Sequence, residues 1–412
     1  MNDTQRAPIS GTDLDARIAG LSPEKRALLA RRLGAARAEV GEAPASPIPP
    51  APRTAPLPLS FAQQRLWFLE QWEGGGAQYN IGQGWWLQGP LEVTQLRAAV
   101  AQLVARHEAL RTVFVSDEGR PRQQVLADLA VEVPLLDLAA LPADEARRQA
   151  LAQARVLARQ GFDLAQAPLL RLTLIRVAAS THLLVLVMHH IVSDGWSMGV
   201  LWRELTALYA GHGEQLPALP VQYADYAQWQ RETLQGAALD QQLAYWRTRL
   251  AGLPPLELPT DRPRPPVQGY RGARHPVALP AQLSAALNEL SRRERVTPYM
   301  LLLAAFQVLL ARYSGQEDIA VGSPIAGRSR REFEGLIGFF VNTLVLRSDL
   351  SGNPRFRELL ARVREHALDA YAHQEVPFEK LVEELKPQRD LSRSPLIQAM
   401  FALQNAPGGE LA

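Results

Sequence analysis

The chain has 412 residues, of which 47% are of apolar types and 21% are charged. This composition supports a large buried core and excludes disorder over most of the chain. The 44 basic and 42 acidic side chains leave a net charge of only +2. We therefore do not expect nucleic acid to be a main partner.

The sequence contains no cysteine. Disulfides, thiolate metal sites, iron–sulfur clusters and a thiol nucleophile are therefore excluded on this chain. No apolar run reaches the length of about 18 residues that a membrane span needs. The N-terminus also lacks the basic-then-apolar pattern of a secretory signal. We expect a cytoplasmic protein without a membrane partner.

The N-terminal segment, residues 1–40, predicts a helical pair over residues 13–37. Leu14, Ile18 and Leu21 have the spacing of one helix face. A unit this small has little core of its own. It is either a docking element for a partner or a weakly ordered extension, and the sequence favours neither.

Proline-rich stretches divide the rest of the chain. Residues 41–58 are dense in proline and predict a semi-rigid linker, with the globular part beginning near residue 59. A second proline cluster, residues 251–270, separates two parts of α/β (α+β) character. We expect a first lobe over 59–250 and a second over 271–412.

Several secondary-structure elements are legible in chain order. The apolar run 183–188 predicts a buried strand, and a helix over 197–210 follows, with Ser197 as its N-cap. The elements predicted for the second lobe are a buried helix over 298–312, strands over 319–324 and 339–347, and an amphipathic helix over 355–372.

The strongest local feature is the segment HHIVSDG, residues 189–195, directly after the apolar strand. Adjacent residues at a strand end point to opposite faces, so at most one of His189 and His190 faces a given cavity. A histidine has an ordinary pKa of about 6.5, so at pH 7 it is mostly neutral and can accept a proton. Asp194 can fix the turn, and Gly195 can offer an unobstructed N–H.

Other interpretations of this segment compete. The paired histidines can be ordinary core or surface residues. A metal site is disfavoured because adjacent histidines rarely bind one ion and no other ligand cluster lies nearby. Residues 195–199, GWSMG, match the G-x-S-x-G pattern of serine hydrolases, but HHIVSD separates the strand from Gly195. Ser197 is therefore interpreted as a helix cap rather than a nucleophile.

The segment resembles the HHxxxDG signature of the condensation domains of non-ribosomal peptide synthetases, and further signatures of that family follow the same order along the chain. The matching segments are SFAQQRLWFLEQ (60–71) with YNI (79–81), RHEALRTVF (106–114), YADYAQWQ (223–230), IGFFVNTLVLR (337–347), HQEVPFEKLV (373–382) and RDLSRSPLIQAMF (389–401). The resemblance covers the chain from about residue 57 to its end.

The resemblance implies two chloramphenicol-acetyltransferase-like lobes in a V-shaped pseudo-dimer, with two channels that meet at His190. The donor would be a peptidyl or aminoacyl thioester on the phosphopantetheine arm of one carrier protein. The acceptor would be the α-amine of an aminoacyl thioester on a second carrier protein. This chain itself would bind no cofactor. Its catalytic work would be to position the two groups, handle the amine proton and stabilise the oxyanion.

The resemblance also implies roles for individual residues. His190 would face the channel and position or deprotonate the amine, while His189 packs away from it. Asp194 would organise the loop, with Arg111 as its expected partner. The N–H of Gly195 is a candidate oxyanion contact.

Four further residues complete the expected site, which includes no metal. Trp196 and Ser197 would support the motif, and Ser323 and Asn342 would line the tunnel from the second lobe. Most matched aromatic residues are expected in the core; they are Trp67, Phe68, Phe114, Trp229, Phe339 and Phe378.

The motifs HHIVSDGWSMGVL and RHEALRTVF look most like the subtype that joins an L-configured donor to an L-configured acceptor. With Met1 and the linker in front, the domain is expected to open its polypeptide and to receive its donor from an upstream synthetase subunit docked through residues 13–37. An initiating domain that takes an acyl group from coenzyme A is an alternative. A stand-alone acyltransferase, a non-catalytic recruitment domain and an epimerase relative are further alternatives.

The resemblance also predicts where the chain departs from the family. Condensation domains normally continue beyond RDLSRSPLIQAMF, whereas this chain stops at Ala412. We therefore expect the second lobe to be incomplete at its C-terminal end and to carry an exposed sheet edge.

Overall fold

The computed structural model describes residues 47–269, 272–387 and 390–404. The chain divides between Ile48 and Pro49, and the fold described below is that of the second unit. The helical pair predicted over residues 13–37 lies outside the described residues.

The first lobe is built around a four-stranded sheet in the order β2-β7-β6-β5, in which only β5 and β6 run parallel. A smaller sheet has the order β1-β4-β3. The elements are β1 (Leu57–Pro58), α3 (Phe61–Glu73), β2 (Asn80–Gln88), α4 (Val93–Arg106), β3 (Thr112–Asp117), β4 (Arg120–Val125), β5 (Leu135–Asp137), α5 (Ala143–Ala158), β6 (Leu170–Ala178), β7 (Thr181–His189), α6 (Gly195–Tyr209) and α7 (Tyr223–Thr233).

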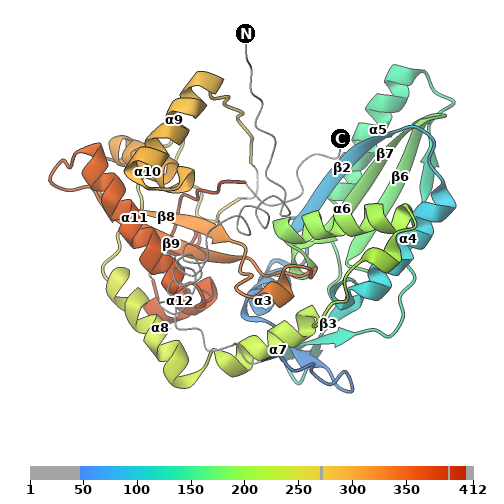
Figure 1. The fold of residues 1–412 in the computed structure, drawn as a ribbon, viewed down its shortest axis with the longest axis horizontal. Coiled ribbons are helices and arrows are strands. Elements are labelled where there is room, and N and C mark those ends of the chain that lie inside the picture. The colour runs from blue at the N-terminus through green and yellow to red at the C-terminus, as the bar shows by residue number, and fades with distance from the viewer. Residues whose placement is uncertain (1–46, 270–271, 388–389, 405–412) are drawn as a thin grey trace, which may run out of the picture. The chain divides into compact units, whose positions relative to one another are not determined.

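The second lobe is built around the antiparallel pair β8–β9. Helices α10 and α11 pack against this pair, and α12 contacts both β9 and α8 (Figure 1). The elements are α8 (Gly236–Arg249), α9 (Ala281–Glu294), α10 (Pro298–Ser314), β8 (Asp318–Ile325), β9 (Asn342–Asp349), α11 (Phe356–Ala372) and α12 (Phe378–Leu385).

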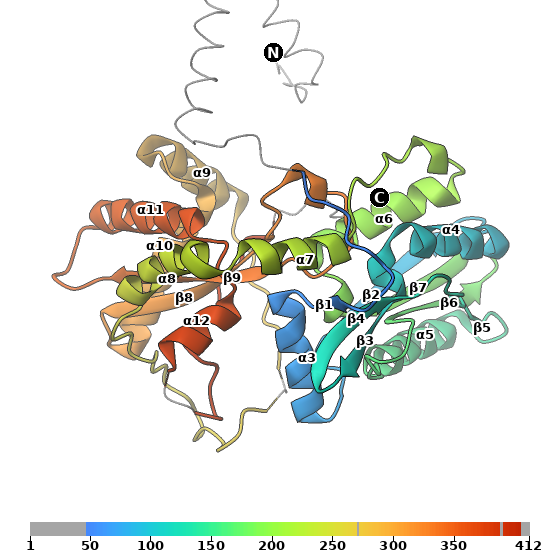
Figure 2. The same ribbon diagram turned by 90° about the horizontal axis from the view of Figure 1, so that it is seen from below.

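Strand β7 is apolar along its length because both faces of its sheet are covered. Helices α4 and α6 lie on one face and α5 lies on the other (Figures 1 and 2). Residues 182–189 of β7 are all buried. The predicted strand over 183–188 is confirmed, and this strand carries the histidine segment at its end.

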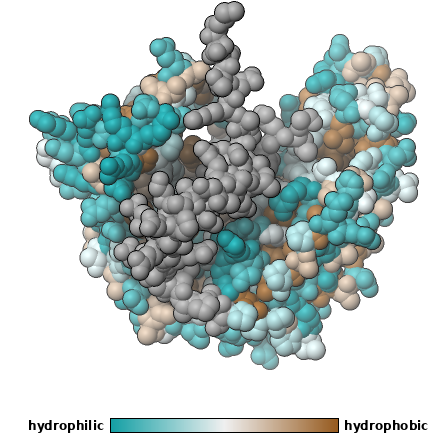
Figure 3. All heavy atoms as spheres, viewed as in Figure 1, coloured by the Kyte–Doolittle hydropathy of each residue, from teal (hydrophilic) through white to brown (hydrophobic). Residues whose placement is uncertain are grey.

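The second-lobe predictions also agree with the structure. The predicted helix over 298–312 is α10, and the strand over 319–324 is β8. Helix α11 is amphipathic, as predicted for residues 355–372: its inner face buries Leu359, Leu360, Val363, Ala367 and Ala370. Figure 3 shows hydrophilic side chains gathered over the outer surface of this part of the lobe.

Two lobe boundaries differ from the prediction. Residues 49–58 belong to the folded unit rather than to a free linker: β1 pairs with β4, and the backbone N–H of Ala51 donates to Asp225 at 2.8 Å. Helix α8 packs with the second lobe, since Trp246 is fully buried in the core cluster of that lobe. The packing boundary between the lobes therefore lies before α8, not near residue 250.

Smaller differences concern element ends and exposure. Helix α6 begins at Gly195, with Asp194 instead of Ser197 as its N-cap. Strand β9 begins at Asn342, later than predicted. Among the matched aromatic residues, Phe68 is 57% exposed, so its prediction as a core residue was wrong.

The segment between β8 and β9, residues 326–341, joins the two lobes. Ile337, near its end, is 1% exposed and belongs to the hydrophobic core of the first lobe. We call residues 326–341 the crossing segment. Its position explains the late start of β9, because these residues are bonded to the first lobe instead of extending the strand.

Among the described residues, no single helix has the length and apolar character to cross a membrane; one pair, α9 with α10, passes that test together but is bent by 105°.

Candidate functional site

The histidine segment forms a tight turn between β7 and α6. Strand β7 ends at His189, a 3₁₀ turn spans His190–Val192, and α6 begins at Gly195. The backbone N–H of His190 donates to the carbonyl of Tyr79 at 2.8 Å, which continues the pairing of β2 with β7. The turn is thus fixed to the edge of the central sheet.

The His190 imidazole is held by one nitrogen. Its Nδ1 lies 2.7 Å from the carbonyl oxygen of Ser193. A carbonyl can only accept, so Nδ1 carries the proton, and a neutral ring leaves a lone pair on Nε2. No described group is hydrogen-bonded to Nε2. Burial, opposed by the Ser193 hydrogen bond and by Asp194, lowers the pKa of His190 below its ordinary value of 6.5, which keeps the ring neutral near pH 7.

His189 has a different environment, as predicted from its position. It is 0% exposed, whereas His190 is half-buried against the ring of Phe339, with 4.8 Å between ring centroids. The Nδ1 atom of His189 accepts the backbone N–H of Ile191 at 3.1 Å. His189 therefore shapes the turn from inside the core.

Asp194 is fully buried, and both of its carboxylate oxygens accept hydrogen bonds. Oδ1 accepts from the backbone N–H of Ser197 at 2.8 Å and from the guanidinium of Arg328 at 3.3 Å. Oδ2 accepts from the backbone N–H of Phe340 at 2.9 Å. These contacts join the helix start to the crossing segment, which is an organising role.

The predicted partner of Asp194 was wrong. Arg111 instead donates to the carbonyl of Leu126 and lies 3.8 Å from Glu108. The arginine that meets Asp194 is Arg328, from the crossing segment. It ends the stretch VGSPIAGR, but no local spacing relates it to a residue so distant in the chain.

Arg328 is itself buried and spends its donors on several acceptors. It donates to the carbonyls of Phe333 and Leu336 and, at 2.8 Å, to the hydroxyl of Ser197. Its guanidinium lies 4.0 Å from the ring centroid of Phe340. Although burial lowers the pKa of Arg328, a guanidinium stays charged in proteins, so Arg328 is a permanent counter-charge for Asp194.

Ser197 and Trp196 bind the crossing segment to α6. The Ser197 hydroxyl donates to the carbonyl of Gly338 at 2.8 Å and accepts its N–H at 3.1 Å. The Trp196 indole N–H donates to the carbonyl of Glu334 at 2.9 Å. Because the Ser197 hydroxyl is buried within these bonds, it does not have the exposed position of a hydrolase nucleophile.

Gly195 and Gly338 are glycines for different reasons. A Cβ on Gly338 would lie 1.9 Å from the ring of Tyr223, so close packing demands glycine there. A Cβ on Gly195 would meet nothing within 4 Å. Gly195 is exposed at the first position of α6, and no described acceptor is bonded to its N–H. An open backbone donor therefore stands at this helix start.

The two second-lobe candidates are held in structural bonds. Ser323 is 3% exposed, and its hydroxyl accepts from Tyr299 at 2.5 Å. Asn342 donates to the carbonyls of Gln374 and Val376 and accepts the N–H of Phe378 at 3.0 Å. Asn342 therefore fastens the start of β9 to the loop before α12. Neither contact tests the predicted tunnel.

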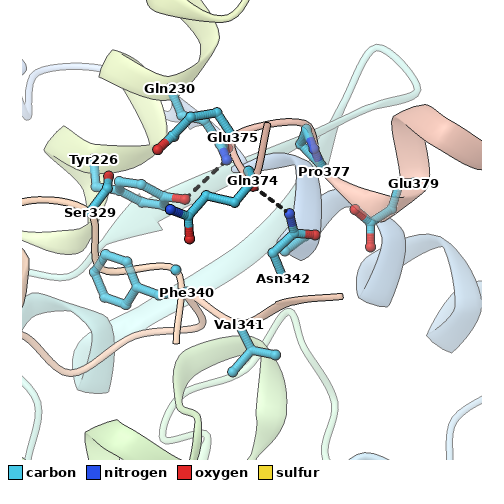
Figure 4. Close-up of a pocket in the computed structure, with 12 residues that line it drawn as sticks. Tyr226, Gln230, Ser329, Phe340, Val341, Asn342, Gln374, Glu375, Pro377 and Glu379 are labelled. Atoms are coloured by element: carbon cyan, nitrogen blue, oxygen red, sulfur yellow. Dashed lines mark hydrogen bonds between the residues drawn. The ribbon is translucent and has the colours of Figure 1, made fainter. Parts of the chain in front are cut away.

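A small cavity of about 30 Å³ lies beside Asn342 (Figure 4). It is lined by polar groups from both lobes, among them Tyr226, Gln230, Ser329 and Glu375. Burial raises the pKa of the Glu375 carboxyl, against the effect of its hydrogen bond from Ser329. The sequence analysis did not identify this cavity, whose lining comes from four separate segments.

No group of three or more His, Cys, Asp or Glu side chains within the described part of the chain is placed to bind a metal ion.

Comparison with known proteins agrees with these features. A sequence model of the condensation-domain family matches residues 54–411. The chain is 53% identical over 361 residues to a linear gramicidin synthase of Brevibacillus parabrevis; the match covers 86% of this chain and 7% of that protein. The chain thus spans less than a tenth of the length of this relative.

Solved structures share the fold. The crystal structure of the X-domain from teicoplanin biosynthesis superimposes with a TM-score of 0.76 at 32% identity, over 86% of this chain and 78% of that one. The first condensation domain of the CDA synthetase gives a TM-score of 0.66 at 24% identity, over 81% and 80%. The expected two-lobed α/β architecture is confirmed, and the chain belongs to the condensation-domain family.

Proposed function

We propose that this domain forms the amide bond between a donor thioester and an acceptor amine during non-ribosomal peptide synthesis. The observation that carries the proposal is the pairing of two open groups at one turn. The Nε2 atom of His190 is an unshared proton acceptor, and the Gly195 N–H is an unshared donor. An amine attacking a thioester needs one group of each kind.

The reaction follows from these groups. The acceptor amine nitrogen attacks the thioester carbonyl carbon, and the Nε2 atom of His190 takes a proton from that nitrogen. The developing oxyanion accepts the Gly195 N–H at the positive end of α6. Collapse of the tetrahedral intermediate forms the C–N bond and breaks the C–S bond, and the proton passes to the departing thiolate. A thioester is already activated, so no covalent enzyme intermediate is required.

Asp194 takes no proton in this scheme. Its two oxygens already accept the N–H of Ser197, the guanidinium of Arg328 and the N–H of Phe340. The carboxylate therefore keeps the helix start and the crossing segment in place while His190 and Gly195 meet the substrates. The scheme assigns chemistry and support to different residues of the same motif.

We assign the substrates to carrier proteins, whose phosphopantetheine arms hold donor and acceptor as thioesters. The resemblance of the motifs around His190 and Arg111 supports an L-configured donor and an L-configured acceptor. Residues 13–37 are proposed to receive the donor-bearing upstream synthetase. A domain that is initiated by acyl-coenzyme A is the competing assignment.

The test is a transfer assay with the full chain and two separately loaded carrier proteins, read by intact-protein mass spectrometry. We expect the acceptor carrier to gain the mass of the donor acyl group, faster with an L-donor than with its D-isomer. Transfer from acyl-coenzyme A without a donor carrier would instead identify an initiating domain. Transfer only to a soluble amine, or no transfer from any donor, would overturn the proposal.

A further inference from the structure

A buried carboxylate lies behind the histidine turn, at Glu70 on α3. The Glu70 side chain is 4% exposed, and His189, which it faces, is 0% exposed. Its Oε2 atom lies 3.7 Å from the Nε2 atom of His189. Neither of these two atoms has a hydrogen-bond partner within the described part of the chain. Two unshared polar atoms thus face one another inside the core, where an unmade hydrogen bond is costly.

The hydrogen bonds of His189 fix which of its nitrogens carries the proton. Its Nδ1 atom accepts the backbone N–H of Ile191 at 3.1 Å, so this nitrogen must present a lone pair. In the neutral ring the proton then sits on Nε2, on the side of Glu70. A displacement of under an ångström would bring this N–H to the usual hydrogen-bond separation of about 2.9 Å from the carboxylate.

This pair is connected to His190 along two routes. Through its side chain, His189 caps the 3₁₀ turn at Ile191, and that turn places the Ser193 carbonyl that holds the His190 ring. Through the chain that follows α3, the other oxygen of Glu70 accepts the N–H of Gly76 at 3.1 Å. The loop so anchored leads to Tyr79, whose carbonyl accepts the backbone N–H of His190.

We propose that Glu70 is a positioning residue that acts through His189 to orient His190, an inference that rests on the proposed role of His190 in amide formation. A carboxylate here selects the His189 tautomer with its proton on Nε2. The other tautomer would set an Nδ1–H against the N–H of Ile191, two donors facing one another. The turn would then loosen and the His190 ring would lose its alignment.

The variant that tests the proposal is Glu70→Gln in the full chain. A glutamine keeps the shape but has only one oxygen, so it cannot accept from both Gly76 and His189. We expect kcat for carrier-to-carrier transfer to fall roughly 10- to 100-fold, as misalignment of a reacting group does. The KM for the acceptor carrier should stay within about twofold, because Glu70 touches no substrate. The matched control, Glu214→Gln at an exposed position, should leave kcat unchanged.

A double-mutant cycle separates positioning from general destabilisation. Asparagine at position 189 has a side-chain oxygen for the Ile191 N–H but has no tautomer to select. In the His189→Asn background, Glu70→Gln should therefore lower kcat by less than about twofold. Equal effects of Glu70→Gln in both backgrounds, or a wild-type kcat in the single variant, would overturn the proposal.

A spectroscopic reading on the wild-type chain keeps the inference testable if a variant fails to fold. In ¹⁵N-histidine-labelled protein near pH 7, the His189 resonances should show a protonated Nε2 and a Nδ1 that accepts a hydrogen bond. The opposite tautomer would overturn the inference. This reading does not depend on transfer activity: absence of transfer with the expected tautomer would contradict the proposed function instead.

Discussion

The turn at residues 189–195 and the crossing segment at residues 326–341 meet at the start of α6, yet they use their polar groups in opposite ways. At the turn, the His190 Nε2 atom and the Gly195 N–H are left unshared. In the crossing segment, Arg328 and the backbone of Gly338 bond to the first lobe. Open groups carry chemistry, and satisfied groups hold them in register.

The largest expected effect on stability comes from breaking the bond between these regions at Asp194. Asp194→Ala leaves the buried Arg328 charge without its carboxylate, and breaking a buried ion pair costs about 3–5 kcal/mol. We expect a clear drop in melting temperature together with loss of transfer. Thermal unfolding followed by circular dichroism checks this. An inactive variant with wild-type melting would show that Asp194 acts directly in the chemistry.

The two glycines give the next comparison. Gly338→Ala would drive a Cβ into the Tyr223 ring, so we expect a loss of about 1–3 kcal/mol, typical of overpacking. Gly195→Ala has open space and should change the free energy of unfolding by under about 0.5 kcal/mol. Denaturant titration measures both. Equal losses at the two positions would contradict the contrast between an open and a packed region.

Ser197→Ala tests the hydrolase interpretation. The change removes the hydroxyl that bonds Gly338 and Arg328, so we expect a loss of about 1–3 kcal/mol in unfolding free energy. Transfer should persist at temperatures where the variant is folded. Complete loss of activity in a variant with wild-type stability would make Ser197 a reacting group.

The smallest effect is a pH dependence. Because the His190 pKa lies below 6.5, the neutral base stays populated as the pH falls through 6.5. The single-turnover rate should thus be flat near pH 7 and should decline only below the lowered pKa. Stability should change in the same direction, since the unfolded chain takes up this proton first as the pH falls. A rate that already halves between pH 8 and 7 would argue against a lowered His190 pKa.

The sequence foresaw what depends on local pattern. The buried strand β7, the helices α10 and α11 and the different environments of His189 and His190 all follow from periodicity within a short window. The N-cap was misassigned by three residues, because both Asp194 and Ser197 are good capping residues and only tertiary contacts decide between them.

What the sequence missed depends on contacts between distant segments. Arg328 meets Asp194 only because the crossing segment returns to the first lobe, and no spacing rule predicts that path. Glu70 was likewise not singled out, since a glutamate on an amphipathic helix is usually exposed. The early part of the folded unit, residues 49–58, was assigned to a linker because proline content hides an edge strand.

The most direct test of the account compares His190→Ala with the wild-type chain in single-turnover transfer between two loaded carrier proteins. The account predicts a rate at least about 100-fold lower, the usual contribution of general-base catalysis, with an unchanged melting temperature. The exposed His212→Ala serves as the matched control and should transfer normally. A His190→Ala variant that is folded and transfers at the wild-type rate would contradict the central claim that the free Nε2 of His190 performs the proton transfer.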